Sequence, residues 1–273
     1  MRQKLVLAVS GKGGVGKTSV TALLIRTLLK YTTRSLLIVD ADPVMNLPKT
    51  LGIDVARTVG DAATQLRRSI DAGTLGHSIS KQDLLEGEVY EALVEGTKFD
   101  FLAMGRTEGE GCYCYVNRIL SQILDILAKN YDITIMDMSA GLEHLSRRTT
   151  RDVDVLVIVI DPSRMAFDAA IRIRNLAKEV QIDFKRIFVI ANCFPASLIE
   201  EVSEDLTCRL ADEGLELVGF VPADDELTAM NLRGKPLLEL PDSSLAVKAV
   251  EAIAKKLGLL GDSTFLELLR PAT

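Results

Sequence analysis

The chain has 273 residues, of which 48% are hydrophobic, and its formal net charge is −6. This length and composition are enough to bury a substantial core in a single α/β domain spanning residues 1–273. The acidic balance argues against a nucleic-acid partner, because neutralising phosphates needs clustered lysines and arginines. No stretch approaches the roughly 18 uninterrupted apolar residues of a membrane span, and no secretory signal pattern precedes the first apolar run. We therefore expect a cytoplasmic protein that binds neither nucleic acid nor membrane.

The first predicted strand, over residues 4–10, leads directly into a glycine-rich loop and a helix. The loop reads Gly11-Lys12-Gly13-Gly14-Val15-Gly16-Lys17-Thr18-Ser19 and fits the phosphate-loop (P-loop) pattern of Gly, four residues, Gly-Lys and a hydroxyl residue. Its glycines allow consecutive backbone N–H groups to converge on phosphates, and the helix N-terminus adds its positive dipole end. Lys17 would reach the β- and γ-phosphates, and the Thr18 hydroxyl would bind Mg²⁺. These residues predict a nucleotide-binding site.

The second predicted strand covers residues 34–39 and ends in Asp40-Ala41-Asp42-Pro43. Carboxylates at the carboxyl end of a parallel strand face the ligand crevice, so Asp40 and Asp42 should lie near the phosphates and Mg²⁺. Asp40 either supports the Mg²⁺ shell or organises a turn, which is a common role of aspartate. Residues 57–97 follow as a surface helical segment for which we predict no chemistry.

A pair of cysteines follows the strand predicted over residues 99–104. The loop at residues 105–114 ends in Cys112-Tyr113-Cys114, just before an amphipathic helix, and is a candidate metal-binding loop. The dipole at a helix start favours thiolates, and a disulfide within Cys-x-Cys would be strained. Two thiolates make half of a tetrahedral Zn²⁺ site or a planar Ni²⁺ site, and a two-fold dimer axis would supply the other half. Burial of the cysteines as small apolar groups is the alternative interpretation.

The remaining predicted strands cover residues 133–136, 155–160, 187–191 and 217–221. Strands alternate with helical patterns almost throughout the chain, which predicts a doubly wound, mostly parallel sheet flanked by helices. Asp137 directly follows one of these strands, and a carboxylate there can support Mg²⁺. We predict that Cys193 and Cys208 pack in the core. A last amphipathic helix is predicted over residues 243–257, and the segment after it has too few basic residues for membrane binding.

The loop Gly11–Thr18 resembles that of the deviant P-loop ATPases, which include nitrogenase iron protein, MinD, ParA and the arsenite-pump ATPase. The resemblance implies that the nucleotide is ATP and that Lys12 crosses a homodimer interface to the phosphates of the partner's nucleotide. It further implies that Asp42 lies in switch I and activates the attacking water, so that Lys12, Lys17 and Asp42 are the catalytic residues. Asn192 and the Pro222-Ala223-Asp224 loop would enclose the adenine. Cys193 departs from this pattern, because family members usually carry a lysine after the asparagine.

Two further segments, residues 111–114 and residues 136–145, resemble the CooC-type ATPases that mature carbon monoxide dehydrogenase. This resemblance implies that Cys112 and Cys114 of two subunits together bind one Ni²⁺ or Zn²⁺ ion under the control of ATP. It places Asp137 at the Walker-B position beside Mg²⁺ and Gly141 in switch II. We interpret His144, which lies behind switch II, as a coupling or structural residue, with metal ligation as the alternative. The predicted function is therefore an ATP-hydrolysing homodimeric metallochaperone that assists nickel insertion into carbon monoxide dehydrogenase or acetyl-CoA synthase.

Two other functions remain open. A MinD- or ParA-type positioning or partition ATPase would carry the same P-loop, but the acidic composition and the weakly basic C-terminal end disfavour binding to DNA or membrane. An iron–sulfur electron donor like nitrogenase iron protein also uses two cysteines per subunit. Its ligands lie far apart in sequence, whereas Cys112 and Cys114 are one residue apart.

Overall fold

The protein is built on one parallel β-sheet. The computed structural model describes residues 4–71, 87–106, 126–127, 129–139, 153–179 and 184–261. The described strands are β1 (Leu5–Gly11), β2 (Leu36–Asp40), β3 (Asp100–Ala103), β4 (Ile133–Asp137), β5 (Val155–Ile160), β6 (Arg186–Phe194) and β7 (Glu216–Pro222). They form a seven-stranded sheet in the order β3-β2-β4-β1-β5-β6-β7, and every neighbouring pair is parallel. The predicted doubly wound α/β fold is confirmed.

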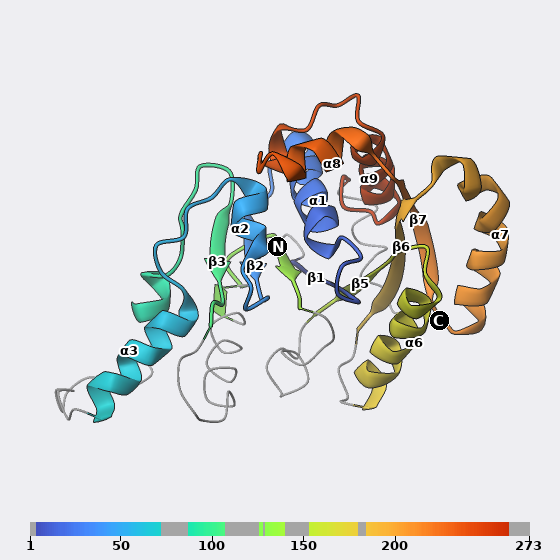
Figure 1. Ribbon diagram of the computed structural model, residues 1–273. Helices are drawn as coiled ribbons and strands as arrows, with labels where there is room; N and C mark the ends of the chain where they lie inside the picture. The colour runs from blue at the N-terminus through green and yellow to red at the C-terminus, as the bar shows by residue number, and fades with distance from the viewer. Residues whose placement is uncertain are drawn as a thin grey trace.

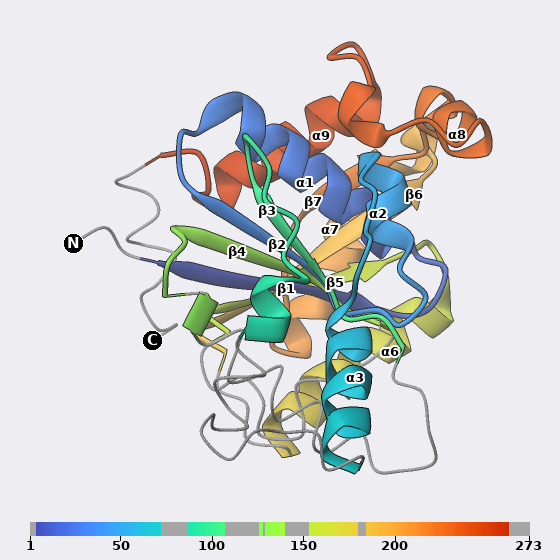
Figure 2. The same ribbon diagram turned by 90° about the vertical axis from the view of Figure 1, so that its left-hand side faces the viewer.

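Helices cover both faces of this sheet. One face carries α1 (Lys17–Tyr31), α2 (Asn46–Leu51), α8 (Asp225–Leu232), the short 3₁₀ helix η1 (Leu237–Glu239) and α9 (Leu245–Lys256). The other face carries α6 (Arg164–Glu179) and α7 (Ala196–Asp212), while α3 (Val59–Asp71) lies on the β3 side of the molecule. Figures 1 and 2 show these two layers from directions 90° apart. The core therefore lies between the sheet and each helical layer.

The central strands have the apolar sequences that burial on both faces requires. Every residue of β1, of β2 and of β5 is buried, in keeping with the continuous apolar runs typical of parallel strands covered by helices. β1 lies at the centre of the sheet, between β4 and β5. On one side of β1 the chain runs outward through β2 to β3 and then returns to β4, and on the other side it runs outward from β5 to β7. Ligands of open α/β sheets bind at such a switch point, outside the carboxyl ends of the strands.

The structure corrects one prediction about the cysteines. Cys193 and Cys208 were predicted to pack in the core, but both thiols are exposed. Cys193 lies in an irregularity of the β6–β7 ladder and has a positive φ of 58°, so the strand turns its side chain outward. Cys208 lies on the outer face of α7, because that helix buries Leu206 and Leu210 against the sheet.

The segment predicted as surface helices, residues 57–97, is only partly helical where the structure describes it. It contains α3 and a helical turn at residues 87–90, and Val94 forms an isolated antiparallel bridge with Phe101. Among the described residues, no helix combines the length and the apolar composition that a bilayer span requires.

Candidate active site

The P-loop joins the end of β1 to the start of α1, and two structural reasons explain its glycines. A Cβ added at Gly11 would clash with the carbonyl oxygen of Val159, so glycine is required for close contact with β5. Gly14 and Gly16 have positive φ angles of 86° and 87°, which favour glycine. An added Cβ at Gly13 or Gly14 would meet nothing within 4 Å, so this part of the loop is open on its outer side. The result is an open cradle of backbone at the N-terminus of α1.

The two residues that follow this cradle begin the helix. Lys17 is only 8% exposed, and its Nζ donates a hydrogen bond of 3.3 Å to the carbonyl oxygen of Lys12. Burial lowers the pKa of Lys17, while the charges of Asp137 and Asp42 oppose that shift. A buried ammonium held inside the loop is placed to neutralise phosphate charge. Ser19 and the Lys12 side chain are partly exposed at the same site.

Asp137 ends β4, next to the P-loop strand, and is the buried carboxylate of the site. Its Oδ2 accepts a hydrogen bond of 2.7 Å from the Thr18 hydroxyl, and its Oδ1 accepts one of 3.1 Å from the Thr21 hydroxyl. Burial raises the pKa of Asp137 to about 6, although both hydroxyls and the charge of Lys17 favour its ionised form.

This donor set fits a magnesium ion. Mg²⁺ prefers oxygen ligands and is commonly held by one or two carboxylates together with substrate phosphates. The Thr18 hydroxyl gives its single proton to Asp137 and keeps its lone pairs for a cation. Asp40 lies opposite Asp137 in the β2–β4 ladder, so two carboxyl groups end neighbouring strands here. The roles of Thr18, Asp40 and Asp137 at Mg²⁺ remain predictions.

The structure shows what Asp40 and Asp42 contact. Asp40 is fully buried; its Oδ1 accepts the N–H of Asp42 at 2.9 Å, and its Oδ2 accepts the N–H of Leu47 at 3.1 Å. Burial raises the pKa of Asp40 to about 7, partly offset by these backbone hydrogen bonds. Asp42 in turn accepts the N–H of Val44 at 2.9 Å. Asp40 thus organises the turn that presents Asp42, which was one of its two predicted roles.

The residues predicted to enclose the adenine also hold the backbone in place. Asn192 is 5% exposed, and its Nδ2 donates a hydrogen bond of 2.8 Å to the carbonyl oxygen of Val15 in the P-loop. A Cβ on Gly16 would clash with this same amide group. The loop Pro222-Ala223-Asp224 begins at the end of β7, and the N–H of Ala223 bonds to the carbonyl oxygen of Phe194 at 2.8 Å.

Asp224 connects two helices. Its Oδ1 caps α8 by accepting the N–H groups of Glu226 and Leu227 at 2.8 and 3.0 Å. Its Oδ2 accepts the Ser244 hydroxyl at 2.6 Å and the N–H of Ala246 at 3.0 Å, both at the start of α9. Burial alone would raise the pKa of Asp224, but these hydrogen bonds outweigh burial and lower it. Contacts of Asn192 or Asp224 with adenine remain predictions.

Residues 6–237 match the sequence profile of the CobQ/CobB/MinD/ParA nucleotide binding domain. The chain belongs to this family. It is therefore a P-loop ATPase of the MinD/ParA type. An uncharacterized ATP-binding protein of Methanocaldococcus jannaschii is 46% identical over 254 residues, which cover 93% of this chain and 98% of that protein. The carbon monoxide dehydrogenase accessory protein CooC of Rhodospirillum rubrum is 31% identical over 249 residues, covering 86% of this chain and 89% of CooC.

A solved structure agrees with the fold of this ATPase. The ParA family ATPase from Chlorobium tepidum superposes with a TM-score of 0.70 at 22% identity, over 95% of this chain and 100% of that chain. A likeness at this identity establishes the architecture, and the chemistry must be argued from the residues.

Several predicted residues of this ATPase fall outside the described part of the chain. They are Cys112, Cys114, Gly141 and His144. Among the residues that the structure does describe, no group of three or more His, Cys, Asp or Glu side chains is arranged to hold a metal ion. Binding of Ni²⁺ or Zn²⁺ by the Cys-x-Cys segment stays a prediction.

Sequence reasoning missed two residues of the site. Thr21 bonds to Asp137, and its signal in the sequence is the three-residue spacing from Thr18, which places both hydroxyls on one helix face. Ser244 bonds to Asp224 across 20 residues of chain, and no short-range pattern could have indicated that pairing.

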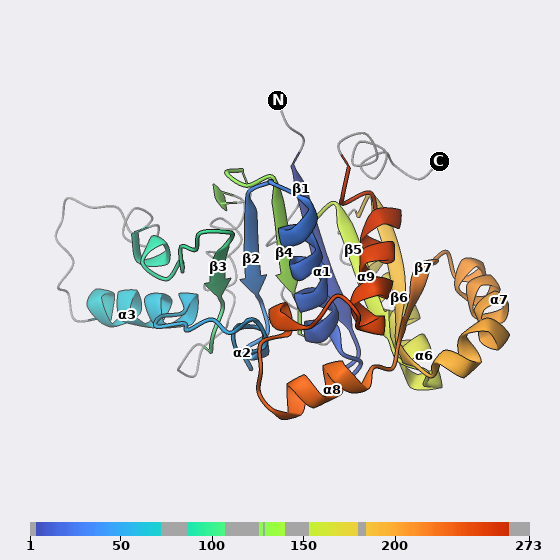
Figure 3. The same cartoon turned by 90° about the horizontal axis from the view of Figure 1, so that it is seen from above.

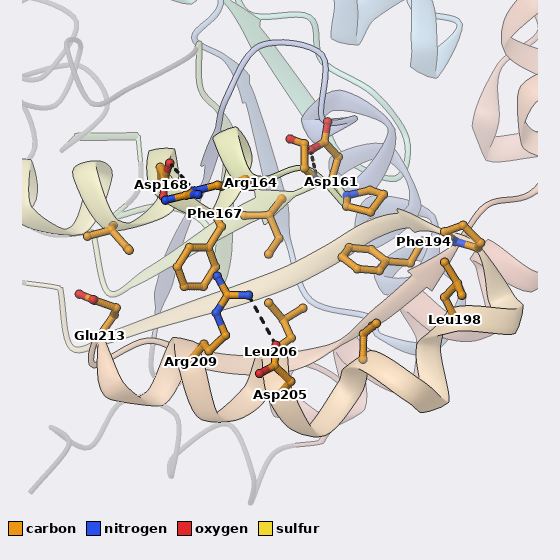
Figure 4. A pocket seen from close by; sticks show the side chains of 16 residues that line it. Asp161, Arg164, Phe167, Asp168, Phe194, Leu198, Asp205, Leu206, Arg209 and Glu213 are labelled. Atoms are coloured by element: carbon orange, nitrogen blue, oxygen red, sulfur yellow. Dashed lines mark hydrogen bonds and ion pairs between the residues drawn. The ribbon is translucent and has the colours of Figure 1, made fainter.

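The ATPase also has a pocket of about 770 Å³ between α6 and α7. Figure 4 shows Phe167, Phe194 and Leu206 pointing into it, with charged side chains around its rim. Four of these charged side chains form two ion pairs, with nitrogen–oxygen distances of 3.9 Å between Arg164 and Asp168 and 3.5 Å between Arg209 and Asp205. The Arg209 guanidinium also lies 4.5 Å from the centre of the Phe167 ring. No P-loop residue lines this pocket, so it is separate from the nucleotide site.

Proposed function

We propose that this ATPase is a homodimeric metallochaperone that assists nickel insertion into carbon monoxide dehydrogenase or acetyl-CoA synthase. The proposal rests on the similarity to CooC along most of both chains, combined with the Cys112-Tyr113-Cys114 segment. The family membership alone supplies the ATPase but not the cargo. The paired soft ligands next to a nucleotide-dependent dimer are what single out metal delivery.

The ATP-hydrolysis chemistry would use the residues gathered at the end of the sheet. The open cradle of residues 11–16 offers backbone N–H groups to the phosphates, and Lys17 neutralises their charge. Thr18 and Asp137 would hold Mg²⁺, which when bound supplies charge stabilisation to the phosphates being separated. Asp42, fixed by its hydrogen bond to Asp40, would orient the attacking water.

Lys12 would make this cycle depend on the dimer. Its backbone is tied to Lys17, whereas its side chain is partly exposed next to the phosphate cradle. In our proposal the Lys12 side chain of each protomer reaches the phosphates bound by the other, so ATP draws the two subunits together. Hydrolysis then removes charge from that contact, and the dimer relaxes.

The metal would be cargo held between the subunits. Cys112 and Cys114 of each protomer would provide four thiolates, which suit a tetrahedral Zn²⁺ or a planar Ni²⁺ ion. Because a two-fold axis brings the same loop of each subunit to one point, a change in dimer geometry would change the geometry of all four ligands together. ATP hydrolysis could thereby weaken the site and release the ion to the client enzyme.

An anaerobic titration with Ni²⁺ and with Zn²⁺, read by native mass spectrometry, tests this proposal. We expect one metal ion per dimer, with an affinity that changes between the apo, ADP-bound and ATP-bound protein. The Cys112→Ser, Cys114→Ser double variant should lose the ion. The matched control is Cys193→Ser, Cys208→Ser, which removes two thiols that are exposed in the structure and should leave metal binding unchanged.

Two outcomes would contradict the proposal. One is failure of the protein to bind either metal while its ATPase activity is intact, and the other is equal metal binding by the two double variants. Co-sedimentation with DNA or with anionic liposomes would then test the MinD/ParA-type positioning function.

The role of Lys12 has its own test. Lys12→Ala should abolish ATP-dependent dimerisation in analytical ultracentrifugation and lower the ATPase rate at least tenfold, yet leave ADP binding within about threefold. Lys17→Ala is the comparison, because it should lose nucleotide binding itself. If Lys12→Ala dimerises normally with ATP, the proposed contact of Lys12 with the phosphates in the other subunit is refuted.

A further inference from the structure

We propose that Thr21 is a positioning residue of the magnesium site, because its hydroxyl holds the oxygen of the Asp137 carboxylate that Thr18 does not contact. The inference rests on the Mg²⁺-dependent chemistry of the ATPase and is independent of metal delivery. It concerns a residue that lies outside the P-loop motif, one helical turn farther along α1.

The geometry places both threonines against the same carboxylate. Thr18 and Thr21 are three residues apart and therefore lie on one face of α1, which runs alongside β1 and β4 (Figure 3). Thr18 bonds to Oδ2 of Asp137 at 2.7 Å, and Thr21 bonds to Oδ1 at 3.1 Å. Thr21 is fully buried and Asp137 is 1% exposed, so water cannot easily replace either hydrogen bond.

A threonine buried inside a helix can satisfy its hydroxyl locally, by donating a hydrogen bond to the carbonyl oxygen four residues earlier. Thr27, on the same helix and equally buried, does this by donating to the carbonyl oxygen of Leu23 at 2.8 Å. Thr21 instead donates to a side chain 116 residues away in sequence. Its hydroxyl is therefore directed at the site.

Removing the Thr21 hydroxyl would change the carboxylate that faces the nucleotide. Each oxygen of Asp137 has one hydroxyl donor, so the carboxylate plane is held at both ends. Without Thr21, Oδ1 would be a buried charged acceptor that lacks this donor, and the group would be free to rotate toward other donors. Thr18 and Oδ2 would then lose the fixed relation that a shared cation requires.

The test compares three variants of the full chain. Thr21→Val has nearly the shape of threonine but lacks the hydroxyl, Thr21→Ser retains the hydroxyl, and Thr27→Val removes an equally buried hydroxyl elsewhere on α1. For each, the binding of a fluorescent ADP analogue is titrated with Mg²⁺, and the ATPase rate is measured at saturating Mg²⁺.

We expect Thr21→Val to raise, at least fivefold, the Mg²⁺ concentration at which the Mg²⁺-dependent change in analogue binding is half-maximal. Binding of the analogue in the absence of Mg²⁺ should stay unchanged within about twofold. Thr21→Ser and Thr27→Val should stay within about twofold of the unaltered chain in both measurements. If Thr21→Val does not fold, the smaller Thr21→Ala takes its place in the same titration.

Unaltered Mg²⁺ dependence in a folded Thr21→Val or Thr21→Ala variant would overturn the inference. An equal shift in Thr27→Val would also overturn it, because the effect would then reflect general loosening of α1. A complete absence of Mg²⁺ dependence in the unaltered chain is a different failure, which would refute the proposed Mg²⁺ site itself.

Discussion

Replacing Asp224 by alanine should show how strongly the start of α8 is tied to α9. The substitution removes a carboxylate that accepts four hydrogen bonds, two from the first turn of α8 and two from Ser244 and Ala246. Loss of an N-cap costs about 1 kcal/mol. Loss of the charged acceptor for the other two donors adds about 2 kcal/mol, since hydrogen bonds to charged groups contribute about 1.5–3 kcal/mol each and are not additive. We expect a total loss of about 3 kcal/mol in the free energy of unfolding.

Thermal unfolding of the nucleotide-free protein, followed by circular dichroism, measures this loss. For a chain of this size, 3 kcal/mol corresponds to a decrease in Tm of about 6–12 °C. Asp225→Ala is the matched control, because Asp225 is exposed and its removal takes the same charge from the same helical turn. The control should cost less than about 1 kcal/mol, the range of an interaction with the helix dipole.

The pH dependence of the Asp224→Ala effect has a definite sign. The folded protein lowers the pKa of Asp224, so the stabilisation is fully present above the unfolded-state value of 3.8. It is lost as the pH falls below that value through the folded-state pKa. Variant and unaltered chain should therefore converge in stability at strongly acidic pH. A cost no larger than that of Asp225→Ala at neutral pH would refute the interpretation of Asp224 as a link between α8 and α9.

Three further predictions concern the P-loop and its surroundings. Gly16→Ala should lower the Tm of the nucleotide-free protein by an amount equivalent to about 2 kcal/mol, because Gly16 has a positive φ and faces the Asn192 amide. Gly13→Ala is the control and should change the free energy of unfolding by no more than about 0.5 kcal/mol. Equal Tm values for the two variants would contradict this prediction. Asn192→Ala should cost about 1–2 kcal/mol in urea denaturation by leaving the Val15 carbonyl oxygen without its donor, and an unchanged midpoint would show that this bond is dispensable. The folded protein raises the pKa of Asp40 from 3.8 to about 7, so ionisation of Asp40 destabilises the ligand-free protein as the pH rises from about 4 to 7. The Asp40→Asn variant should therefore gain stability relative to the unaltered chain across that pH range, by at most about 4 kcal/mol. A stability difference that does not depend on pH would refute this prediction.

Much of the fold could be predicted because its strands are marked by local patterns of apolar residues. The strand before the P-loop is a continuous apolar run, and β1, β4 and β5 were predicted within one residue at each end. The end of β6 was not, since the strand continues through an irregularity at Cys193 to Phe194. Nothing in the residue types of this segment marks that irregularity, and the same feature makes the predicted burial of Cys193 wrong.

The error at Cys208 had a different origin. Leu206 and Leu210 are four residues apart and define the buried face of α7, so the position between them lies on the opposite side. The prediction followed the general tendency of cysteine to be buried, whereas helical periodicity places this cysteine at the surface.

The functional residues divide in the same way. The P-loop is a contiguous motif with a known chemical use, and Asp137 follows a recognisable strand, so both could be proposed as site residues from the sequence. The hydrogen bonds that hold this site in place were not predicted. The bond from Asn192 to Val15 joins residues 177 positions apart, and the bond from Thr21 to Asp137 joins residues 116 positions apart. Such pairs depend on the order of strands in the sheet, which a single sequence does not state.

That strand order also determines when the nucleotide site can form during synthesis. β1 is made first, but its neighbours in the sheet begin at Ile133 and Val155. The contacts of α1, the helix after the P-loop, are completed even later in synthesis. Its Arg26 and Lys30 pair with Asp242, just before α9, and Glu251, within α9.

At a synthesis rate of about 5–20 residues per second, the interval between completing α1 and starting α9 is about 10–40 s. Throughout that interval α9 does not yet cover the apolar face of α1, and the nucleotide site is incomplete. Bound ATP therefore cannot stabilise the emerging chain during this interval, and the first motif translated is among the last parts of the molecule to become functional.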